Sequence, residues 1–586
     1  ERSDLNMSFL NRRNFLKWSA AAATMALIGC GNDNDSFFTT TTMVEVPQSL
    51  FPGEEDPLDL TSASERPPTE IPNPDRFFGP DVAFEGQVPT NVTRLGDSFQ
   101  HIVVLQLENR SLDNLLGYLY PNDQSPQGQS FNGVATRSLS NPIPSYAPES
   151  ERGTVPVSKS FGLLNPVYDP AEQYTAVNLA LYNQFNPPSN QFVTAEEDFV
   201  FPYNLPDAGA TFPPPLTGFV KAFYWRLLSA NKSATYADYS TIMQCFAPSQ
   251  VPVISQLAQN YAVCDNWFCG VPSQTYTNRA FFHAASSAGY LVNSPSYRWP
   301  FFNNAPTIFE SLTNAGRQLT VYYDGLDVLP FTRLLHYPRL KKFPDKAPFF
   351  KDMTSFYDDV EGGNLPDYSF IQPRFVLETN SYHPDKGAPA VKRGEILVND
   401  VYQAIRQSNS TTGSNFLNTL LVITFDEGGT TYDHVPPPAA ASPADGYLGQ
   451  YGFGFDRLGQ RIPCILVSPW LPPGTVINTQ LDANSIMKTI EEKFGLSSIN
   501  ARDAASPSLM NIDVLASPRT RDQMSRLQVR RLSAEEAQSD SDQKPGDLAE
   551  GLLGMVHAVA TNSQAPPPEI ATIGQAIDFL KQNKPD

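Results

Sequence analysis

Three groups of polar residues contain the side chains that phosphoryl-transfer chemistry requires. They are residues 108–110, residues 271–279 and residues 426–434, and together they hold carboxylates, amides, hydroxyls, arginines and a histidine. Carboxylate and amide oxygens are hard ligands that suit a divalent metal ion. A hydroxyl beside such an ion is more easily deprotonated and can attack phosphorus, while arginine holds phosphoryl oxygens with paired hydrogen bonds. Residues of these types could together carry out metal-assisted attack on a phosphoric ester.

Each group also has an ordinary structural interpretation when it is taken alone. A carboxylate that follows a strand is commonly a helix cap or part of a surface ion pair. The hydroxyl of Thr275 is of the kind that hydrogen-bonds its own loop. Composition and spacing leave both interpretations open.

Apolar runs of strand length lead into two of these groups. Residues 101–107 precede Glu108, residues 420–425 precede Asp426, and residues 462–467 form a third run that also ends in a polar residue. Continuous apolar runs are typical of buried parallel strands, and open α/β sheets bind ligands at the carboxyl ends of such strands. We therefore expect these polar residues at one edge of a sheet.

A helix is predicted after Gly394, because the apolar residues there recur with helical spacing: Leu397, Val401, Ala404 and Ile405. Strands that alternate with helices indicate an α/β domain. Residues 122–240 are rich in Pro, Asn and aromatic residues, and long irregular insertions in compact domains are usually functional or disordered. We expect a mostly parallel sheet flanked by helices, with loop-rich insertions that shape a substrate cleft.

The first thirty residues have the composition of an export signal. Arg12 and Arg13 precede a short apolar run that ends at Cys30. The pattern resembles a bacterial twin-arginine signal followed by a lipobox, in which the cysteine is lipidated. We predict export by the twin-arginine machinery to the periplasm or cell surface. A lipid on Cys30 is the only membrane anchor that we predict.

The rest of the chain divides by composition into three parts. Residues 31–97 are poor in apolar residues and are predicted to be a disordered tether and entry loop. Residues 98–517 are predicted to be the catalytic domain. Residues 518–586 are predicted to be a polar extension with two short helices, near residues 552–560 and 573–580.

Net charge and cysteine content narrow the classes of partner. The chain of 586 residues has a net charge of −20, which disfavours nucleic acid and anionic membranes as broad partners. Four cysteines lie beyond Cys30 and could pair or remain thiols: Cys245, Cys264, Cys269 and Cys464.

Taken together, the motifs resemble the phosphoesterase family of bacterial and plant non-specific phospholipases C and related acid phosphatases, within the alkaline-phosphatase-like superfamily. The similarity covers about residues 98–515. The matching motifs occur in the family's order: His101 to Ser111, Val263 to Arg279, Asn380 to Pro384, Thr424 to Pro438, and Ile462 to Pro469. The resemblance implies an alkaline-phosphatase-like core.

The resemblance also implies a metal site and a nucleophile. Glu108, Asn109, Asp426 and Glu427 would bind one or more divalent metal ions, whose identity the sequence does not give. Thr275 would be the hydroxyl that becomes phosphorylated and would also contact the metal. Asn109 would in addition orient the phosphoryl group.

Further residues are assigned around that centre by the same resemblance. Asn278 and Arg279 would act beside the nucleophile, with Arg279 on the phosphoryl oxygens. His383 or His434 would protonate the leaving alcohol. His283 would contact the substrate, with a core histidine bonded to backbone as the alternative.

Among the departures from the family's pattern, two concern residues that could bind the metal or phosphate. Gly428 and Ala483 stand where many members have histidine, so a site with a single metal ion or altered ligands stays open. The predicted function is an exported, metal-dependent phosphoric-ester hydrolase, phospholipase C-like, with a phosphoester or phospholipid substrate and a phosphothreonine intermediate. The alternatives are an acid phosphatase acting on monoesters and a lipid-anchored binding protein without turnover.

Overall fold

The computed structural model describes residues 66–585 except residues 80–83, 85, 87, 193–199, 201–211, 343–348 and 522–525. The predicted export signal, the Cys30 lipid site and most of the predicted tether lie outside the described residues.

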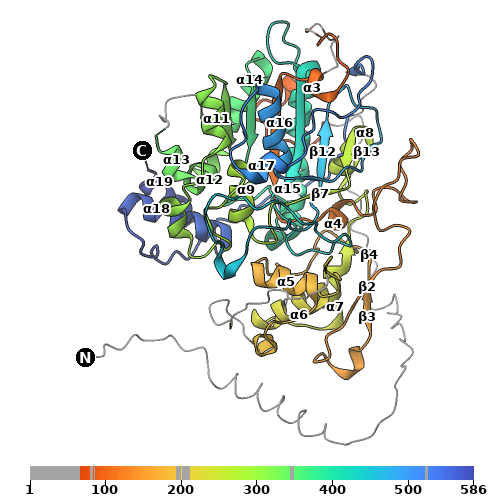
Figure 1. Ribbon diagram of the computed structural model, residues 1–586, viewed down its shortest axis with the longest axis vertical. Helices are drawn as coiled ribbons and strands as arrows, with labels where there is room; N and C mark the ends of the chain where they lie inside the picture. The colour runs from red at the N-terminus through yellow and green to blue at the C-terminus, as the bar shows by residue number, and fades with distance from the viewer. Residues whose placement is uncertain are drawn as a thin grey trace, which may run out of the picture. The chain divides into compact units, whose positions relative to one another are not determined.

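A sheet of eight strands forms the centre, in the order β13-β6-β12-β11-β1-β10-β8-β9 (Figure 1). Its strands are β1 (His101–Leu107), β6 (Ala262–Cys264), β8 (Leu319–Tyr323), β9 (Phe350–Asp352), β10 (Tyr368–Ile371), β11 (Thr419–Phe425), β12 (Cys464–Val467) and β13 (Thr475–Ile477). The central strand β1 pairs in parallel with both β10 and β11. The predicted mostly parallel α/β sheet is confirmed.

Strand β12 departs from the expected direction. It pairs antiparallel with both β11 and β6, so its carboxyl end lies at the edge opposite to the ends of β1 and β11. The third apolar run is therefore a strand, as predicted, but the polar residue that follows it, Ser468, points away from the edge where Glu108 and Asp426 lie. A short apolar run indicates burial and does not encode strand direction.

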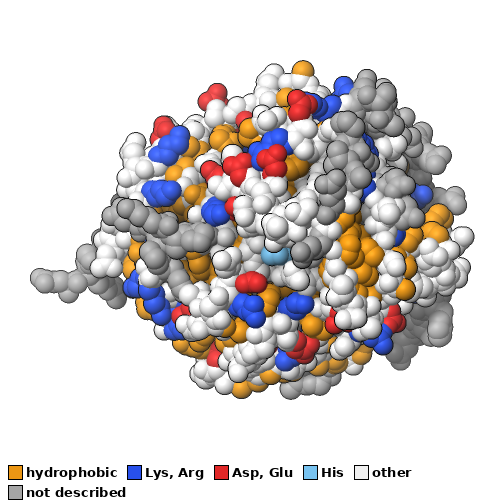
Figure 2. Space-filling model, turned by 90° about the horizontal axis from the view of Figure 1, so that it is seen from above, with side chains coloured by type: hydrophobic (Ala, Val, Ile, Leu, Met, Phe, Trp, Pro, Cys, Tyr) orange, Lys and Arg blue, Asp and Glu red, His pale blue; other side chains and the backbone are white. Residues whose placement is uncertain are grey.

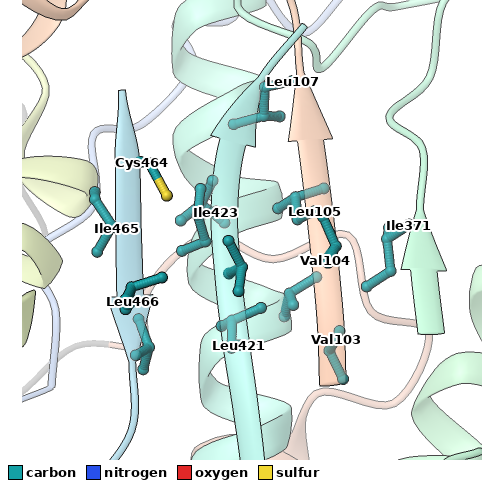
Figure 3. Close-up of a cluster of buried hydrophobic side chains, with 14 of the residues drawn as sticks. Val103, Val104, Leu105, Leu107, Ile371, Leu421, Ile423, Cys464, Ile465 and Leu466 are labelled. Atoms are coloured by element: carbon teal, nitrogen blue, oxygen red, sulfur yellow. The ribbon is translucent and has the colours of Figure 1, made fainter. Parts of the chain in front are cut away.

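The apolar side chains of the central strands make the core. Leu105 of β1 is the register partner of Ile423 in β11, and Val103 is the partner of Leu421. Figure 3 shows these side chains packed across neighbouring strands together with Ile371 of β10. Each buried aliphatic side chain of this size contributes about 1.5–3 kcal/mol, which explains why the strands are continuous apolar runs.

Helices pack in two layers against the sheet. One contains α8 (Pro252–Asn260), α14 (Met353–Gly362) and α15 (Gly387–Gln407), and the other contains α9 (Thr275–Ala284), α11 (Ile308–Asn314) and α16 (Asn484–Phe494). The helix predicted after Gly394 is α15, but it begins seven residues before that glycine, at Gly387. Position 394 inside the helix is a glycine because a Cβ there would come within 2.3 Å of the Tyr382 ring.

The loop-rich insertion carries a small apolar cluster of its own. Helices α5 (Tyr174–Tyr182), α6 (Phe219–Ser229) and α7 (Tyr236–Tyr239) form it beside the ladder of β2 (Ser140–Pro142) and β3 (Thr154–Pro156). The remaining elements are α2 (Asp75–Phe78), α3 (Leu95–Ser98), α4 (Leu112–Leu116), α10 (Trp299–Phe302), α12 (Phe331–Leu335), α13 (Tyr337–Leu340), α17 (Ala501–Ala505), β4 (Ser158–Lys159), β5 (Gln244–Cys245), β7 (Trp267–Phe268) and β14 (Leu481–Asp482).

The two helices predicted near the carboxyl terminus are present. They are α18 (Asp547–Thr561) and α19 (Ile573–Asn583). Leu552, Val556 and Leu580 pack in one cluster with residues of α12. This apolar contact attaches the polar carboxyl-terminal segment to the rest of the fold.

The cysteines, the hydropathy of the helices and the surface charge can each be read from the described residues. The four cysteines of the described part are buried free thiols. No helix among the described residues is long and apolar enough to cross a bilayer. On the face seen in Figure 2, acidic and basic side chains are interspersed. That face has no extended basic patch of the kind that binds nucleic acid.

Candidate active site

The adjacent ends of β1 and β11 bring together four of the five residues predicted to bind metal, namely Glu108, Asn109, Asp426 and Glu427. Leu107 and Phe425 are register partners, so Glu108 and Asp426 follow side by side. The backbone N–H groups of Asn109 and Glu427 both donate to Asp426 Oδ1, at 3.1 and 2.8 Å. All four predicted ligands are buried.

The turn after β1 has an unusual backbone that keeps this arrangement compact. Asn109 has a φ of +57°, in the left-handed region that few residues other than glycine and asparagine adopt. Gly429 has a φ of +58°, and a Cβ there would come within 2.3 Å of the Asn109 carbonyl oxygen. The second glycine after Glu427 is therefore required by close backbone approach.

Helix α9 brings Arg279 to these carboxylates and carries Thr275 one turn earlier. Thr275 is its first residue, and Arg279 lies one turn later on the same face. Arg279 Nε donates to Asp426 Oδ2 at 3.0 Å, and Nη2 lies 3.8 Å from Glu108 Oε1. Nη1 donates to Gln106 Oε1 at 3.2 Å, and Nη2 donates to the Leu107 carbonyl at 3.2 Å. The guanidinium thus joins α9 to the sheet and to two predicted metal ligands.

Thr275 and Asn278 differ in how their side chains are used. Asn278 Oδ1 accepts from the Val271 N–H at 2.9 Å, and its Nδ2 donates to the Ser273 carbonyl at 2.6 Å. Asn278 therefore shapes the loop that precedes the helix. Thr275 is 3% exposed, and its hydroxyl makes no hydrogen bond to any residue that the structure describes. The hydroxyl is available for chemistry.

His383 joins the site from the motif after β10. Its Nε2 lies 2.8 Å from Asn109 Nδ2, and its Nδ1 lies 2.8 Å from Asp385 Oδ1. Burial alone would lower the pKa of His383, but Asp385, Asp169 and Glu172 outweigh burial and hold it well above its ordinary value. The surrounding carboxylates therefore favour the charged form of the His383 ring.

Two acidic residues of the site, Asp169 and Glu172, were missed by sequence reasoning. Both come from the loop-rich insertion, and ligand atoms of Asp169, Glu172 and His383 all lie within 4.8 Å of one another. Glu172 also accepts a hydrogen bond from the Asn109 side-chain amide. The pair follows no strand and belongs to no recognised motif, so the sequence contains no signal that distinguishes it from surface carboxylates.

The charge balance of the site is that of a cation-binding centre. Burial, with the neighbouring Asp426, raises the pKa of Glu108 to about 7, and burial raises the pKa of Glu427 well above its ordinary value. Oxygens of Glu108, Asn109, Asp169 and Glu427 are buried and have no hydrogen-bond partner among the described residues. Unpaired buried oxygens are costly unless a cation satisfies them. The donor set of hard carboxylate and amide oxygens fits a divalent metal ion.

The start of α18 closes one side of this site. Gly546, Leu548 and Ala549 line a cavity of about 10 Å³ together with Glu108 and His383. This space is enough for about one water molecule. The carboxyl-terminal segment therefore contributes to the wall of the site.

His434 belongs to a different cluster. Its Nδ1 lies 2.6 Å from Asp113 Oδ2 and its Nε2 lies 3.1 Å from Asn132 Oδ1, so both ring nitrogens are engaged. Arg461 pairs with Asp113 and with Asp433, each at 2.9 Å. Ligand atoms of Asp113, Asp433 and His434 lie within 4.8 Å of one another, and the buried Arg461 guanidinium supplies positive charge to both carboxylates.

His283 is packed among aromatic rings. Its ring centroid lies 4.5 Å from that of Phe370 and 4.8 Å from that of Phe309. Burial, followed by the nearby His336 and Arg279, lowers its pKa well below the ordinary value, and neither ring nitrogen has a partner among the described residues. The structure does not bring His283 into contact with the residues that surround Glu108.

The two departures from the family's pattern are filled by packing. A Cβ at Gly428 would come within 3.0 Å of the Gln460 side chain. Ala483 is buried at the start of α16, where its N–H donates to the Phe268 carbonyl at 2.9 Å. Gly428 is therefore closely approached by a neighbour, and Ala483 is buried in the packing at the start of α16.

Buried carboxylates at the carboxyl edge of a mostly parallel sheet, joined through Arg279 to the helix that begins with Thr275, lie where open α/β sheets place ligands. The chain belongs to the phosphoesterase family, whose family model matches residues 99–497, and it is thus an ester-bond hydrolase. A twin-arginine translocation signal sequence matches residues 10–29, so the chain carries a signal for export out of the cytoplasm.

Relatives of known name are plant and bacterial phospholipases C. The chain is 32% identical over 436 residues to non-specific phospholipase C3 of Arabidopsis thaliana, which covers 72% of this chain and 74% of that protein. It is 27% identical over 319 residues to a non-hemolytic phospholipase C of Burkholderia pseudomallei, covering 45% of this chain and 42% of that protein. A solved structure of an alkaline phosphatase superfamily protein from Vibrio parahaemolyticus is 12% identical, with a TM-score of 0.27 over 57% of this chain and 81% of that chain.

Proposed function

We propose that the protein is a metal-dependent phospholipase C-like hydrolase that works through a phosphothreonine at Thr275. The observation that carries the proposal is that the Thr275 hydroxyl makes no hydrogen bond to the described residues and lies one helical turn from Arg279, which donates to Asp426. In the proposed first step Thr275 Oγ bonds to phosphorus, the bond from phosphorus to the glycerol oxygen breaks, and that oxygen takes up a proton. Water then cleaves the phosphothreonine and releases the phosphorylated head group.

The site residues have separate roles in this scheme. A divalent ion held by Glu108, Asn109, Asp426 and Glu427 would supply positive charge that favours the deprotonated hydroxyl and the developing phosphoryl charge. Arg279 acts as a positioning residue, since its hydrogen bonds hold Asp426 and the helix that carries the nucleophile. This refines the expectation that Arg279 contacts the phosphoryl oxygens directly.

The proposal is tested by products and metal content. The purified protein should release phosphorylcholine from phosphatidylcholine faster than it releases phosphate from 4-nitrophenyl phosphate, and active samples should contain a divalent metal by elemental analysis. Preference for the monoester would favour the acid phosphatase alternative. No turnover on either substrate with metal bound would favour the binding protein.

Of the two candidate histidines, we propose His383 as the proton donor to the leaving alcohol. It lies beside Asn109 in the carboxylate site, where Asp385 and Asp169 raise its pKa against the effect of burial, whereas His434 lies in the separate cluster of Asp113 and Arg461. His383→Gln should slow hydrolysis of an alkyl phosphodiester by ~10²-fold or more, because an alkoxide is a poor leaving group without a proton. A 4-nitrophenyl diester, whose leaving group needs no proton, should be affected far less.

His434→Gln serves as the matched control for this test. It should lower the melting temperature, since it perturbs the Asp113 and Arg461 network, without changing the ratio of the two rates. A large change in that ratio for His434→Gln, with none for His383→Gln, would reverse the assignment.

The raised pKa values predict how metal removal depends on pH. Glu108 titrates near 7 when folded and near 4.5 when unfolded, so the metal-free fold loses stability as pH rises through this interval and the carboxyl must ionise without a partner. The difference in melting temperature between metal-loaded and chelator-treated protein should therefore be larger at about pH 8 than at about pH 5. Differential scanning calorimetry at both pH values measures it, and an equal difference at the two would contradict a metal site built on these carboxyls.

Export should depend on the guanidinium groups of the signal. Arg12→Lys with Arg13→Lys keeps the charge, but lysine lacks the planar fork of donors that arginine presents. The double variant should accumulate as precursor in the cytoplasm, as seen by immunoblotting of cell fractions. Normal export of the double lysine variant would exclude the twin-arginine route.

We also propose lipidation of Cys30, and the variant Cys30→Ala should appear in the soluble exported fraction.

A further inference from the structure

We propose that a groove beside the nucleophile loop, with exposed apolar side chains at its rim, receives acyl chains of a zwitterionic bilayer and docks the enzyme on it. The groove lies between residues 288–290, residues 301–304 and residues 447–450, and has a volume of about 510 Å³. The inference rests on the proposed function, because a phospholipase must reach a substrate that is embedded in a membrane. It adds a surface distinct from the lipid predicted on Cys30.

Three large apolar side chains stand exposed around this groove. Leu448 is 79% exposed, Tyr447 is 48% exposed and Phe302 is 46% exposed. All three line the same groove. Exposed apolar side chains that gather at one hollow mark an interaction site, whereas isolated ones are normal on any surface.

The uncharged lining of the groove and the net charge of the chain favour a neutral membrane as the partner. The residues that line the groove in the described structure include no Asp, Glu, Lys or Arg, while the chain as a whole carries a net charge of −20. An anionic membrane would be repelled by that net charge, and so would a second copy of the chain. A neutral, zwitterionic lipid surface contacts the apolar rim without this penalty.

Hydrogen bonds connect the groove to the nucleophile. The Gln450 N–H donates to the Gly289 carbonyl at 3.0 Å, which joins two walls of the groove. A few residues further on, the Asn293 N–H donates to Gln274 Oε1 at 3.0 Å, and Gln274 directly precedes Thr275. The groove and the predicted nucleophile therefore share one continuous framework.

The exposed rim is also held in place. Asp445 Oδ1 accepts from the Tyr447 N–H at 3.1 Å, and its Oδ2 accepts from the Ser286 hydroxyl, which lies just after α9. Gln450 Oε1 accepts from the Leu291 N–H at 2.7 Å. The turn that presents Tyr447 and Leu448 is thus fixed to the helix of the nucleophile, as a docking surface requires.

The test uses the full chain with Cys30→Ala, so that no lipid anchor contributes to binding. The double variant Phe302→Ser and Leu448→Ser should bind pure phosphatidylcholine vesicles at least ~10-fold more weakly in sedimentation assays, since two apolar insertions are lost. Its rate on the vesicles should fall by a similar factor. Its rate on water-soluble 4-nitrophenylphosphorylcholine should equal that of the parent, because neither residue belongs to the carboxylate site.

A matched control replaces two exposed apolar residues elsewhere, Val88→Ser and Leu326→Ser, which are 45% and 44% exposed. This pair should leave vesicle binding unchanged. The inference is overturned if the groove variant binds vesicles as the parent does, or if it changes only the oligomeric state in analytical ultracentrifugation. Failure of the proposed function is distinguishable, because the parent would then bind vesicles and hydrolyse neither substrate.

Discussion

Thr275→Val should lower turnover by at least ~10³-fold while leaving the fold intact, because it removes the attacking oxygen and keeps the shape of the side chain. Thr275 begins α9 and is almost fully buried, and its hydroxyl supports no hydrogen bond to the described residues. Its loss should therefore cost little stability. Steady-state kinetics together with thermal melting separate the two effects.

Thr277→Val is the matched control for this experiment. Thr277 lies on the same helix and is fully buried, and its hydroxyl makes only a long contact of 3.4 Å to the Tyr290 carbonyl. The control should keep most of the activity. Acid quenching during turnover should trap phosphate on the peptide that contains Thr275, and vanadate should inhibit the enzyme as a mimic of the transition state. A Thr275→Val enzyme of near wild-type rate, with no phosphate on that peptide, would remove the phosphothreonine intermediate.

Glu108→Gln and Asp426→Asn should each abolish bound metal and activity together. Both substitutions keep the size of the side chain but remove an anionic ligand from a buried site. In Asp426→Asn the Arg279 guanidinium also loses its ion pair, so the helix that carries Thr275 is held less firmly. Elemental analysis and the rate on phosphatidylcholine measure the two losses, and chelator treatment of the wild type should reproduce them.

Asp433→Asn is the matched control for the metal ligands. Asp433 is equally buried and also paired with an arginine, Arg461, but it lies in the cluster around His434. It should reduce stability and leave the metal content per folded chain unchanged. If Glu108→Gln and Asp426→Asn both retained wild-type metal content, the ligand assignment would be wrong.

The local features of the sequence predicted the centre of the fold well. The runs ending at Leu107 and Phe425 are continuous and apolar because both strands are buried on both faces, and this pattern is visible without a structure. Since the carboxyl ends of adjacent parallel strands meet, the positions of Glu108 and Asp426 also followed from the sequence. The start of α15 did not follow from the sequence. Glycine commonly marks the end of a helix, but Gly394 lies inside α15, where the lack of a side chain makes room for the Tyr382 ring.

Contacts between distant segments were decided by the tertiary structure alone. Glu172 reaches Asn109 from an irregular insertion, and the antiparallel direction of β12 takes Ser468 away from the site. The sequence offered His383 and His434 equally as the proton donor, because both lie in motifs that match the family. In the structure only His383 lies beside the predicted metal ligands.

The sequence by itself therefore determined the export signal, the buried strands and the residue types of the site, because these depend on composition, periodicity and order along the chain. Only the tertiary structure decided which carboxylates surround Asn109, that Arg279 pairs with Asp426, and that a groove with an apolar rim adjoins the Thr275 loop. Such contacts arise from packing between elements far apart in sequence, and no local pattern encodes which surfaces will meet.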